Sequence, residues 1–230
     1  MTHSHILVEV CVDRLESALI AQQSGADRVE LNLALELEGL TPSAGLLLRV
    51  ASQLKIPVIA MARPRAGGFC YAEDDWATLL KDADWLIGNG ATGIAFGALT
   101  PAGSVDVDRC RQMRKLIGER ELVFHKAFDE VADPLEALEQ LDSVGIDRVM
   151  TSGLAATAEE GIASIAQLEQ RSGRIEILPA GGISSQNAGL LVTHTGCRQI
   201  HGSFRNSTDG DLGREIRSVI ASLKDLHLEP

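Results

Sequence analysis

The sequence predicts a single α/β domain over residues 1–230, folded as a TIM (β/α)8 barrel. Short apolar runs alternate with longer amphipathic stretches along the whole chain, as strands alternate with helices in this fold. Eight parallel strands close such a barrel, and 230 residues are enough to build one. The apolar runs that we expect to form strands are 6–10, 27–31, 57–61, 92–96, 121–125, 147–150, 175–178 and 198–201.

A weak internal repeat favours the closed barrel over an open sheet. Gly25, Gly90, Gly145 and Gly196 each end a helical stretch and precede a strand, at similar intervals that each hold two strand–helix units. Four double units close naturally into a barrel, whereas an open doubly wound sheet has no reason for fourfold regularity.

Helices are expected between the strands, and several carry start signals. Asp13, Ser43 and Asp133 stand where a helix would begin, and Thr157 with Glu160 has the spacing of a capping box. The expected helices are 14–24, 43–54, 74–88, 106–117, 134–143, 157–170, 185–193 and 211–224.

Composition excludes several classes of partner. A net charge of −11 and an aromatic content of 3% disfavour nucleic acid, because binding it needs basic patches and stacking surfaces. We see no membrane span, no signal peptide and no paired cysteine motif. The sequence therefore predicts a cytoplasmic protein with free thiols and a small-molecule ligand.

Charged residues within or after the first three strands predict a pocket, because chemistry in a barrel collects at the C-terminal strand ends. Glu9 and Glu30 are carboxylates inside apolar strands, where burial requires a charged or hydrogen-bonded partner. Arg28 shares a face with Glu30 by period-2 alternation. Arg63 follows strand three and is our expected counter-ion for both carboxylates, and Arg65 is a further candidate for binding an anionic ligand.

The fifth and eighth strands add titratable groups. His125 is a candidate proton shuttle, and His201 is a candidate either for the site or for the core. Lys126 should point away from His125 unless the backbone turns there, which makes it a weaker candidate for substrate binding. Asp129 is expected to orient His125 or a nearby arginine, or to begin a helix.

Small and hydroxyl residues after strands six to eight resemble an anion-binding rim. Gly181 and Gly182 follow strand seven and Ser203 follows strand eight, where many barrels bind phosphate through backbone N–H groups. Thr151 and Ser152 after strand six add hydroxyl donors.

Copper is the one metal for which the strand ends offer a soft ligand. Cys11 lies at the correct end of strand one, but Asn32, not a second cysteine, follows strand two. No other cofactor is indicated, and the sequence carries no dinucleotide fingerprint.

Eight short segments carry the most specific pattern, at 8–13, 25–31, 39–43, 61–65, 96–100, 124–129, 151–153 and 179–183. Together they resemble the CutC family, whose members are labelled copper homeostasis proteins. The resemblance implies a cytoplasmic, oligomeric TIM barrel with a polar pocket at the C-terminal strand ends and a link to copper tolerance. Asn32 stands where the family often has Cys, Lys126 where it has Arg, and Ala180 where it has Gly.

Three hypotheses about function follow from these observations. The first is a barrel that binds a small anionic metabolite and, if it is an enzyme, transfers protons as an isomerase, lyase or hydrolase. The second is a copper-binding protein that uses Cys11 with histidines or with a ligand from another subunit. The third is a barrel that has kept its fold and lost catalysis.

Overall fold

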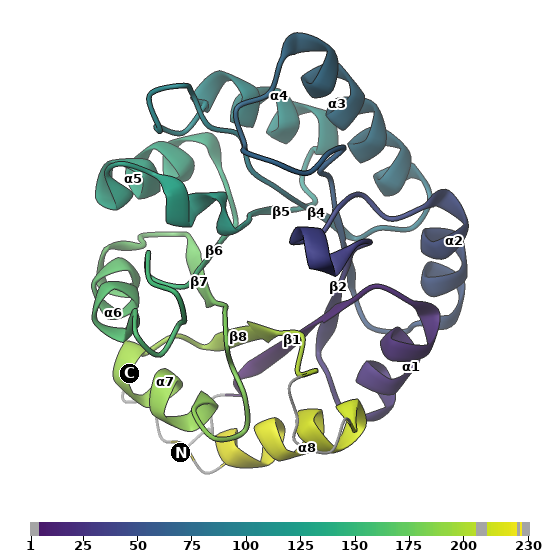
Figure 1. Ribbon diagram of the computed structural model, residues 1–230, viewed down its shortest axis with the longest axis vertical. Coiled ribbons are helices and arrows are strands. Elements are labelled where there is room, and N and C mark those ends of the chain that lie inside the picture. Colours follow the sequence, from purple (N-terminus) through teal and green to yellow (C-terminus); the bar gives the residue numbers. More distant parts are fainter. Residues whose placement is uncertain (1–4, 206–210, 225, 227–230) are drawn as a thin grey trace.

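The computed structural model describes residues 5–205, 211–224 and 226, and within them eight parallel strands stand inside a ring of eight α-helices (Figure 1). The strands are β1 (Leu7–Val12), β2 (Arg28–Leu31), β3 (Val58–Met61), β4 (Gly93–Phe96), β5 (Glu121–Phe124), β6 (Arg148–Thr151), β7 (Glu176–Pro179) and β8 (Gln199–Gly202). The α-helices are α1 (Leu15–Gln23), α2 (Ala44–Gln53), α3 (Glu73–Gly88), α4 (Val107–Ile117), α5 (Pro134–Val144), α6 (Ile162–Arg171), α7 (Ala188–Thr195) and α8 (Leu212–Leu223). Two 3-10 helices, η1 (Leu35–Leu37) and η2 (Lys126–Glu130), lie in loops at the C-terminal side of the strands.

The sheet runs in sequence order around the barrel, with β8 paired to β1 and each strand from β1 to β6 paired to the next. A parallel bridge between Ala180 and His201 joins the ends of β7 and β8. The predicted TIM barrel is confirmed, and each expected strand lies within two residues of the observed one.

Alternation along each strand separates two apolar layers. On β1, Val8 and Val10 face the helices and join the large core between sheet and helices, whereas Glu9 and Cys11 face inward. A second, smaller apolar cluster fills part of the barrel interior: Ile59, Met61, Ala95, Val123, Met150, Leu178 and Ala180.

Helix starts follow the expected capping at two positions. The Ser43 hydroxyl accepts from the Leu46 N–H at 3.2 Å, and the Asp133 carboxylate accepts from the N–H groups of Leu135 and Glu136. These bonds satisfy donors that the first helical turn leaves without intrahelical partners.

Two other expected helix starts are wrong. Asp13 does not cap α1, because its carboxylate pairs with Arg205 and Arg14. Thr157 does accept from the Glu160 N–H at 3.2 Å, but residues 157–161 form a turn, and α6 begins only at Ile162. Gly161 packs so closely on the loop after β6 that a Cβ there would lie 1.9 Å from the Ser152 carbonyl oxygen.

No described helix has both the length and the apolar character needed to cross a bilayer. The longest of them, α3, has 16 residues and carries three acidic residues in its first turn.

Candidate functional site

The barrel interior has a polar side and an apolar side. Strands β8, β1 and β2 turn polar side chains inward, whereas most of the apolar inner cluster comes from β3 to β7. Glu9 and Cys11 of β1, Glu30 of β2 and His201 of β8 lie on the polar side, each 8% exposed or less. Four chemically reactive groups are thus held within the barrel by regular strand alternation.

The register between β1 and β2 decides which of these side chains face one another. Glu9 lies level with Arg28, and Cys11 lies level with Glu30. Arg28 Nε forms a buried ion pair with Glu9. Our expectation that Arg63 neutralises both carboxylates is therefore wrong, because the neighbouring strand already places Arg28 opposite Glu9.

His201 connects the two carboxylates. Its Nδ1 lies 2.7 Å from Glu9 Oε1, and its Nε2 lies 3.7 Å from Glu30 Oε2. Burial alone would raise the pKa of Glu9, but the charges of Arg28 and His201 outweigh burial and lower it. Burial also disfavours a charged His201, yet Glu30 and Glu9 together raise its pKa.

Glu30 differs from Glu9 in lacking an arginine. Burial raises the pKa of its carboxyl group, and the nearby charge of His201 opposes this only in part. Asn32 Nδ2 donates to Glu30 Oε2 at 2.7 Å, whereas Glu30 Oε1 has no hydrogen-bond partner among the described residues.

Cys11 completes the cluster. Its sulfur accepts a hydrogen bond from Asn32 Nδ2 at 3.2 Å, and burial raises the pKa of the thiol well above its usual value. Ligand atoms of Cys11, Glu30 and His201 lie within 4.8 Å of one another. We call these three residues the Cys–Glu–His cluster.

A central cavity of about 310 Å³ opens at the C-terminal side of this cluster. Its wall combines charged groups with apolar ones from nearly the whole circumference of the barrel. The lining residues are Cys11, Glu30, Asn32, Leu35, Glu38, Met61, Arg63, Phe69, His125, Lys126, Asp129, Glu130, Met150 and His201.

His125 faces this cavity from the end of β5. Its Nδ1 accepts from the Ala127 N–H at 3.1 Å, which leaves Nε2 as a buried atom without a partner among the described residues. Burial and the nearby charge of Arg63 lower the pKa of His125 to about 3. The imidazole is therefore neutral near pH 7, and it packs against the Phe69 ring at a centroid distance of 4.9 Å.

The backbone turns immediately after His125, because η2 begins at Lys126. Lys126 consequently lines the same cavity as His125, contrary to the expectation for a continuous strand. Asp129 contacts neither His125 nor Arg63; its carboxylate accepts hydrogen bonds from the hydroxyls of Thr151 and Ser152 and lies 3.8 Å from Lys126 Nζ. The two hydroxyl residues thus anchor Asp129, and neither lines the central cavity.

The two arginines after β3 have different positions. Arg63 lines the central cavity, but its guanidinium donates to the carbonyl oxygens of Leu37, Gly39 and Gly67 and so joins two loops. Arg65 pairs with Asp75 at 2.6 Å and is not among the described residues that line either cavity at the C-terminal strand ends. Arg65 as an anion-binding residue is therefore not supported by its position.

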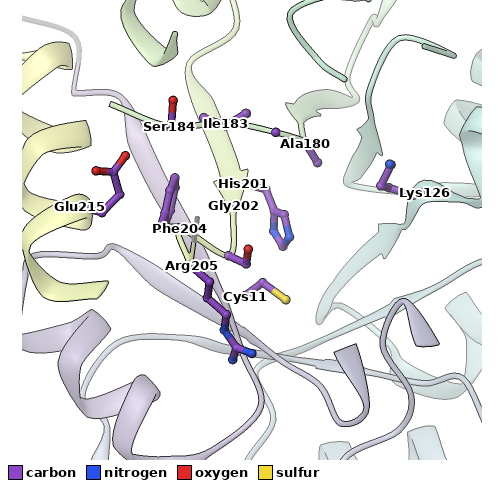
Figure 2. A pocket seen from close by; sticks show the side chains of 13 residues that line it. Cys11, Lys126, Ala180, Ile183, Ser184, His201, Gly202, Phe204, Arg205 and Glu215 are labelled. Carbon is purple, nitrogen blue, oxygen red and sulfur yellow. The ribbon is translucent and has the colours of Figure 1, made fainter. Parts of the chain in front are cut away.

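A second cavity of about 250 Å³, which we call the rim cavity, adjoins the central one at the loops after β7 and β8. Cys11, Lys126 and His201 line both cavities, and Figure 2 shows His201 and the Cys11 sulfur pointing into the space between β8 and Lys126. The other lining residues are Ala180, Gly181, Gly182, Ile183, Ser184, Gly202, Ser203, Phe204, Arg205 and Glu215.

Backbone donors face this rim. The N–H groups of Gly182 and Ile183 donate no hydrogen bond to any described residue, and Gly181 precedes them in the same turn. Both glycines have positive φ, and a Cβ built on Gly181 would lie 3.6 Å from Lys126 Nζ. Free N–H groups beside an ammonium are the arrangement that binds an anion.

Three residues that line the cavities were not predicted from the sequence: Glu38, Phe69 and Arg205. Phe69 comes from the loop after β3, far from any strand end, and Glu38 comes from the loop that contains η1. Arg205 lines the rim cavity and pairs with Asp13, and only its position four residues after His201 could have indicated it.

Comparison with known proteins places these features in a family. The CutC family model matches residues 6–206. This range includes all of the Cys–Glu–His cluster and every residue that lines the two cavities except Glu215. The chain belongs to the CutC family. A CutC family protein of Treponema denticola is 47% identical over 198 residues, covering 86% of this chain and 80% of that protein.

Two further relatives agree. The human copper homeostasis protein cutC homolog is 41% identical over 214 residues, covering 93% of this chain and 78% of the human protein. The crystal structure of the CutC copper homeostasis protein from Streptococcus agalactiae has a TM-score of 0.82 at 29% identity, covering 86% of this chain and 98% of that one. The likeness to CutC thus extends through the barrel.

The copper in the relatives' names can be tested against the donors of this CutC chain. Cu(I) prefers thiolate, thioether and imidazole ligands. Cys11 and His201 are such donors, but the third group within reach is the Glu30 carboxylate. A cysteine at position 32 would supply a second soft ligand beside Cys11, but the side chain there is the amide of Asn32. The described cluster therefore does not fit a Cu(I) site within one subunit.

Proposed function

We propose that this CutC protein binds a small anionic metabolite at the C-terminal rim of its barrel. The observation that carries the proposal is the glycine turn after β7, where the backbone N–H groups of Gly182 and Ile183 have no described acceptor and Gly181 lies beside Lys126. A phosphate or carboxylate group there would accept these hydrogen bonds and neutralise the ammonium. Ser203 adds a hydroxyl to the same cavity.

The rest of the ligand extends into the central cavity in this proposal. The two cavities share three lining residues, and their volumes of about 250 and 310 Å³ suit a metabolite of modest size. Phe69 and Met150 offer apolar contact there, whereas His125 Nε2 and Glu30 Oε1 offer unpartnered polar atoms. Such a mixture of apolar walls and few directed polar groups is typical of ligand sites.

The chemistry that we propose for this ligand is proton transfer, in an isomerase, lyase or hydrolase reaction. Glu30 and His201 are buried titratable groups at the junction of the cavities. Burial raises the pKa of Glu30, and the negative charges of Glu30 and Glu9 raise the pKa of His201. Titratable pairs with shifted pKa values cluster at functional sites. Glu9 lies behind His201, so its role in this scheme is to position the imidazole.

We also propose a cytoplasmic location. Cys11, Cys70, Cys110 and Cys197 are all free, as expected in a reducing compartment.

Calorimetric titration with matched ligands tests the anion site. Phosphate monoesters and dicarboxylates should bind, and the corresponding alcohols and amides should bind at least tenfold more weakly. Lys126→Ala should weaken binding of the anions by tenfold or more. The matched control is Arg65→Ala, which also removes a cation from the C-terminal side of the strands. Because Arg65 pairs with Asp75, this variant should leave anion binding unchanged.

Equal binding of charged and neutral ligands, or an equal loss in both variants, would refute the proposal. The titration is performed in the presence of a chelator, so that its outcome does not depend on any metal ion.

A further inference from the structure

The Cys–Glu–His cluster has the composition and spacing of a metal site. A thiol, a carboxylate and an imidazole from three adjacent strands place their ligand atoms within 4.8 Å of one another. Around a tetrahedral zinc ion, neighbouring ligand atoms are roughly 3.3 to 3.7 Å apart. His201 Nε2 and Glu30 Oε2 already lie 3.7 Å apart, so small side-chain shifts would complete the arrangement.

The orientation of His201 is already that of a metal ligand. Its Nδ1 is hydrogen-bonded to Glu9, which leaves Nε2 directed toward Glu30. Metal-binding histidines almost always have the other ring nitrogen on a carboxylate or carbonyl, which fixes the tautomer and makes the ligand more basic. Arg28 holds Glu9 in turn through a buried ion pair, which fixes the carboxylate that orients His201.

Glu30 provides a second and independent indication. Its side chain is 3% exposed, and Oε1 has no hydrogen-bond partner among the described residues although Glu30 lines the central cavity. An unsatisfied carboxylate oxygen inside a protein is costly unless a cation or donor reaches it. Asn32 Nδ2 donates both to Glu30 Oε2 and to the Cys11 sulfur, and so holds two of the three ligands together.

We propose that Cys11, Glu30 and His201 bind one divalent ion of the zinc type, with its remaining coordination position open to the central cavity. The inference deepens the proposed function, because it rests on the same cavity and names what would activate a ligand held there. Three protein ligands with one open position are typical of catalytic zinc sites.

The donor chemistry selects the class of ion. One thiolate, one imidazole and one carboxylate combine soft, borderline and hard donors, which suits Zn²⁺ and Co²⁺. Mg²⁺ and Ca²⁺ prefer sites built from oxygen alone, and Cu(I) prefers sulfur and imidazole. The charges agree as well, because a thiolate and a carboxylate together balance a divalent cation.

Such an ion would stand at the junction of the two cavities. Cys11 and His201 line both of them, and Lys126 faces the same space from the start of η2 (Figure 2). A water or an anionic ligand at the open position would therefore be within the cavity that the glycine turn borders. A bound divalent ion can lower the pKa of such a water or polarise a bound oxygen.

Metal titration of the full-length protein, after treatment with a chelator, tests the proposal. Zn²⁺ should bind with a stoichiometry of one per chain, measured by competition with a chromogenic chelator. Co²⁺ should give the absorption bands of a tetrahedral ion with a thiolate ligand. Cys11→Ser should weaken Zn²⁺ binding at least 100-fold and abolish the thiolate band.

The matched control is Cys110→Ser. Cys110 is likewise buried, but it lies on α4 and packs in the core between sheet and helices. This variant should bind both ions as the unmodified protein does. Glu9→Gln, which keeps an acceptor for His201 but removes the charge, should weaken binding about 10- to 100-fold.

Three outcomes would overturn the inference: no stoichiometric binding of Zn²⁺ or Co²⁺, binding that survives in Cys11→Ser, or binding of Cu(I) alone. Circular dichroism of each variant separates loss of the site from loss of the fold. Anion binding is measured in the presence of a chelator, and metal binding is measured without the anion. The two experiments are therefore independent, and failure of one proposal does not decide the other.

Discussion

Asn32 donates a hydrogen bond to the sulfur of Cys11 across the β1–β2 pair, with 3.2 Å between Nδ2 and Sγ. The amide thus occupies the position from which a second soft ligand could reach a metal ion beside Cys11. The side chain at this position should therefore decide which class of metal the cluster prefers.

Asn32→Cys should convert the cluster to one that prefers Cu(I). Two neighbouring thiolates with the His201 imidazole form a soft donor set, so Cu(I) affinity should rise at least tenfold while Zn²⁺ affinity changes less. Competition titrations with a Cu(I)-specific chelator measure the change. Asn32→Ala removes the amide without adding sulfur, and an equal rise in that variant would show that the thiol is not responsible.

The buried pair of Arg28 and Glu9 supports a second prediction, about stability. Both side chains are at most 5% exposed, so Arg28→Met would leave the Glu9 carboxylate without its strongest partner in an apolar environment. Removing one member of a buried ion pair typically costs about 3 to 5 kcal/mol. Urea denaturation at neutral pH should show a loss of this size in the free energy of unfolding.

The double variant Arg28→Met with Glu9→Gln provides the control. It removes the stranded charge, so it should recover a large part of the loss, as expected for residues that act as a pair. If the double variant is less stable than Arg28→Met alone, Arg28 stabilises the barrel by packing or through its 2.6 Å bond to Gln199, and not through Glu9.

The pair of Glu9 and Arg28 shows which part of the site the sequence predicts and which part it does not. Period-2 alternation correctly predicts that Glu9, Arg28 and Glu30 point into the barrel. It does not give the stagger between neighbouring parallel strands, and that stagger puts Arg28 opposite Glu9 and Cys11 opposite Glu30. Arg63, which we expected from the sequence to be the counter-ion of both carboxylates, instead donates hydrogen bonds to loop carbonyl oxygens.

The same limit applies at the ends of strands. The repeated alternation of apolar runs and helices predicts eight strands and their order, because these depend on local pattern and on closure. The turn after His125 depends on the hydrogen bond from the Ala127 N–H to the imidazole and on the neighbouring strands, and a continuous strand was the simpler expectation. Lys126 enters the cavity for this reason.

A third prediction concerns the pH dependence of stability. The pKa of His125 is about 3 in the folded protein, whereas a histidine in an unfolded chain titrates near 6.5. Between these values the unfolded state binds more protons, so the free energy of unfolding should rise with pH by up to about 1.4 kcal/mol per pH unit from this group. The contribution is complete above about pH 6.5 and is lost progressively as pH falls toward 3.

His125→Asn isolates this contribution. The amide oxygen of asparagine can still accept from the Ala127 N–H, but the side chain does not titrate. The difference in unfolding free energy between the two proteins, measured by urea denaturation from pH 4 to 8, should therefore narrow as the pH falls. A difference that stays constant over this range would mean that His125 is not held neutral by burial.

A fourth prediction concerns Arg63 and the loops that it joins. Its Nη1 donates to the carbonyl oxygens of Leu37 and Gly39 in the loop after β2, and its Nη2 donates to Gly67 in the loop after β3. Hydrogen bonds from a charged donor are typically worth about 1.5 to 3 kcal/mol each. Lysine carries the same charge but lacks the planar fork, so Arg63→Lys cannot reach both loops together.

Limited proteolysis with a glutamate-specific protease should detect the change. Glu36 lies in η1 and Glu38 ends it, and both are exposed, so cleavage in this loop should become several-fold faster in Arg63→Lys. Arg65→Lys, which alters an arginine two residues along that pairs with Asp75, should leave the rate unchanged. Because the loop with η1 also supplies Leu35 and Glu38 to the central cavity, its release should weaken ligand binding in the same variant. An unchanged cleavage rate would show that the loop holds its conformation through the Leu33–Leu40 bridge without Arg63.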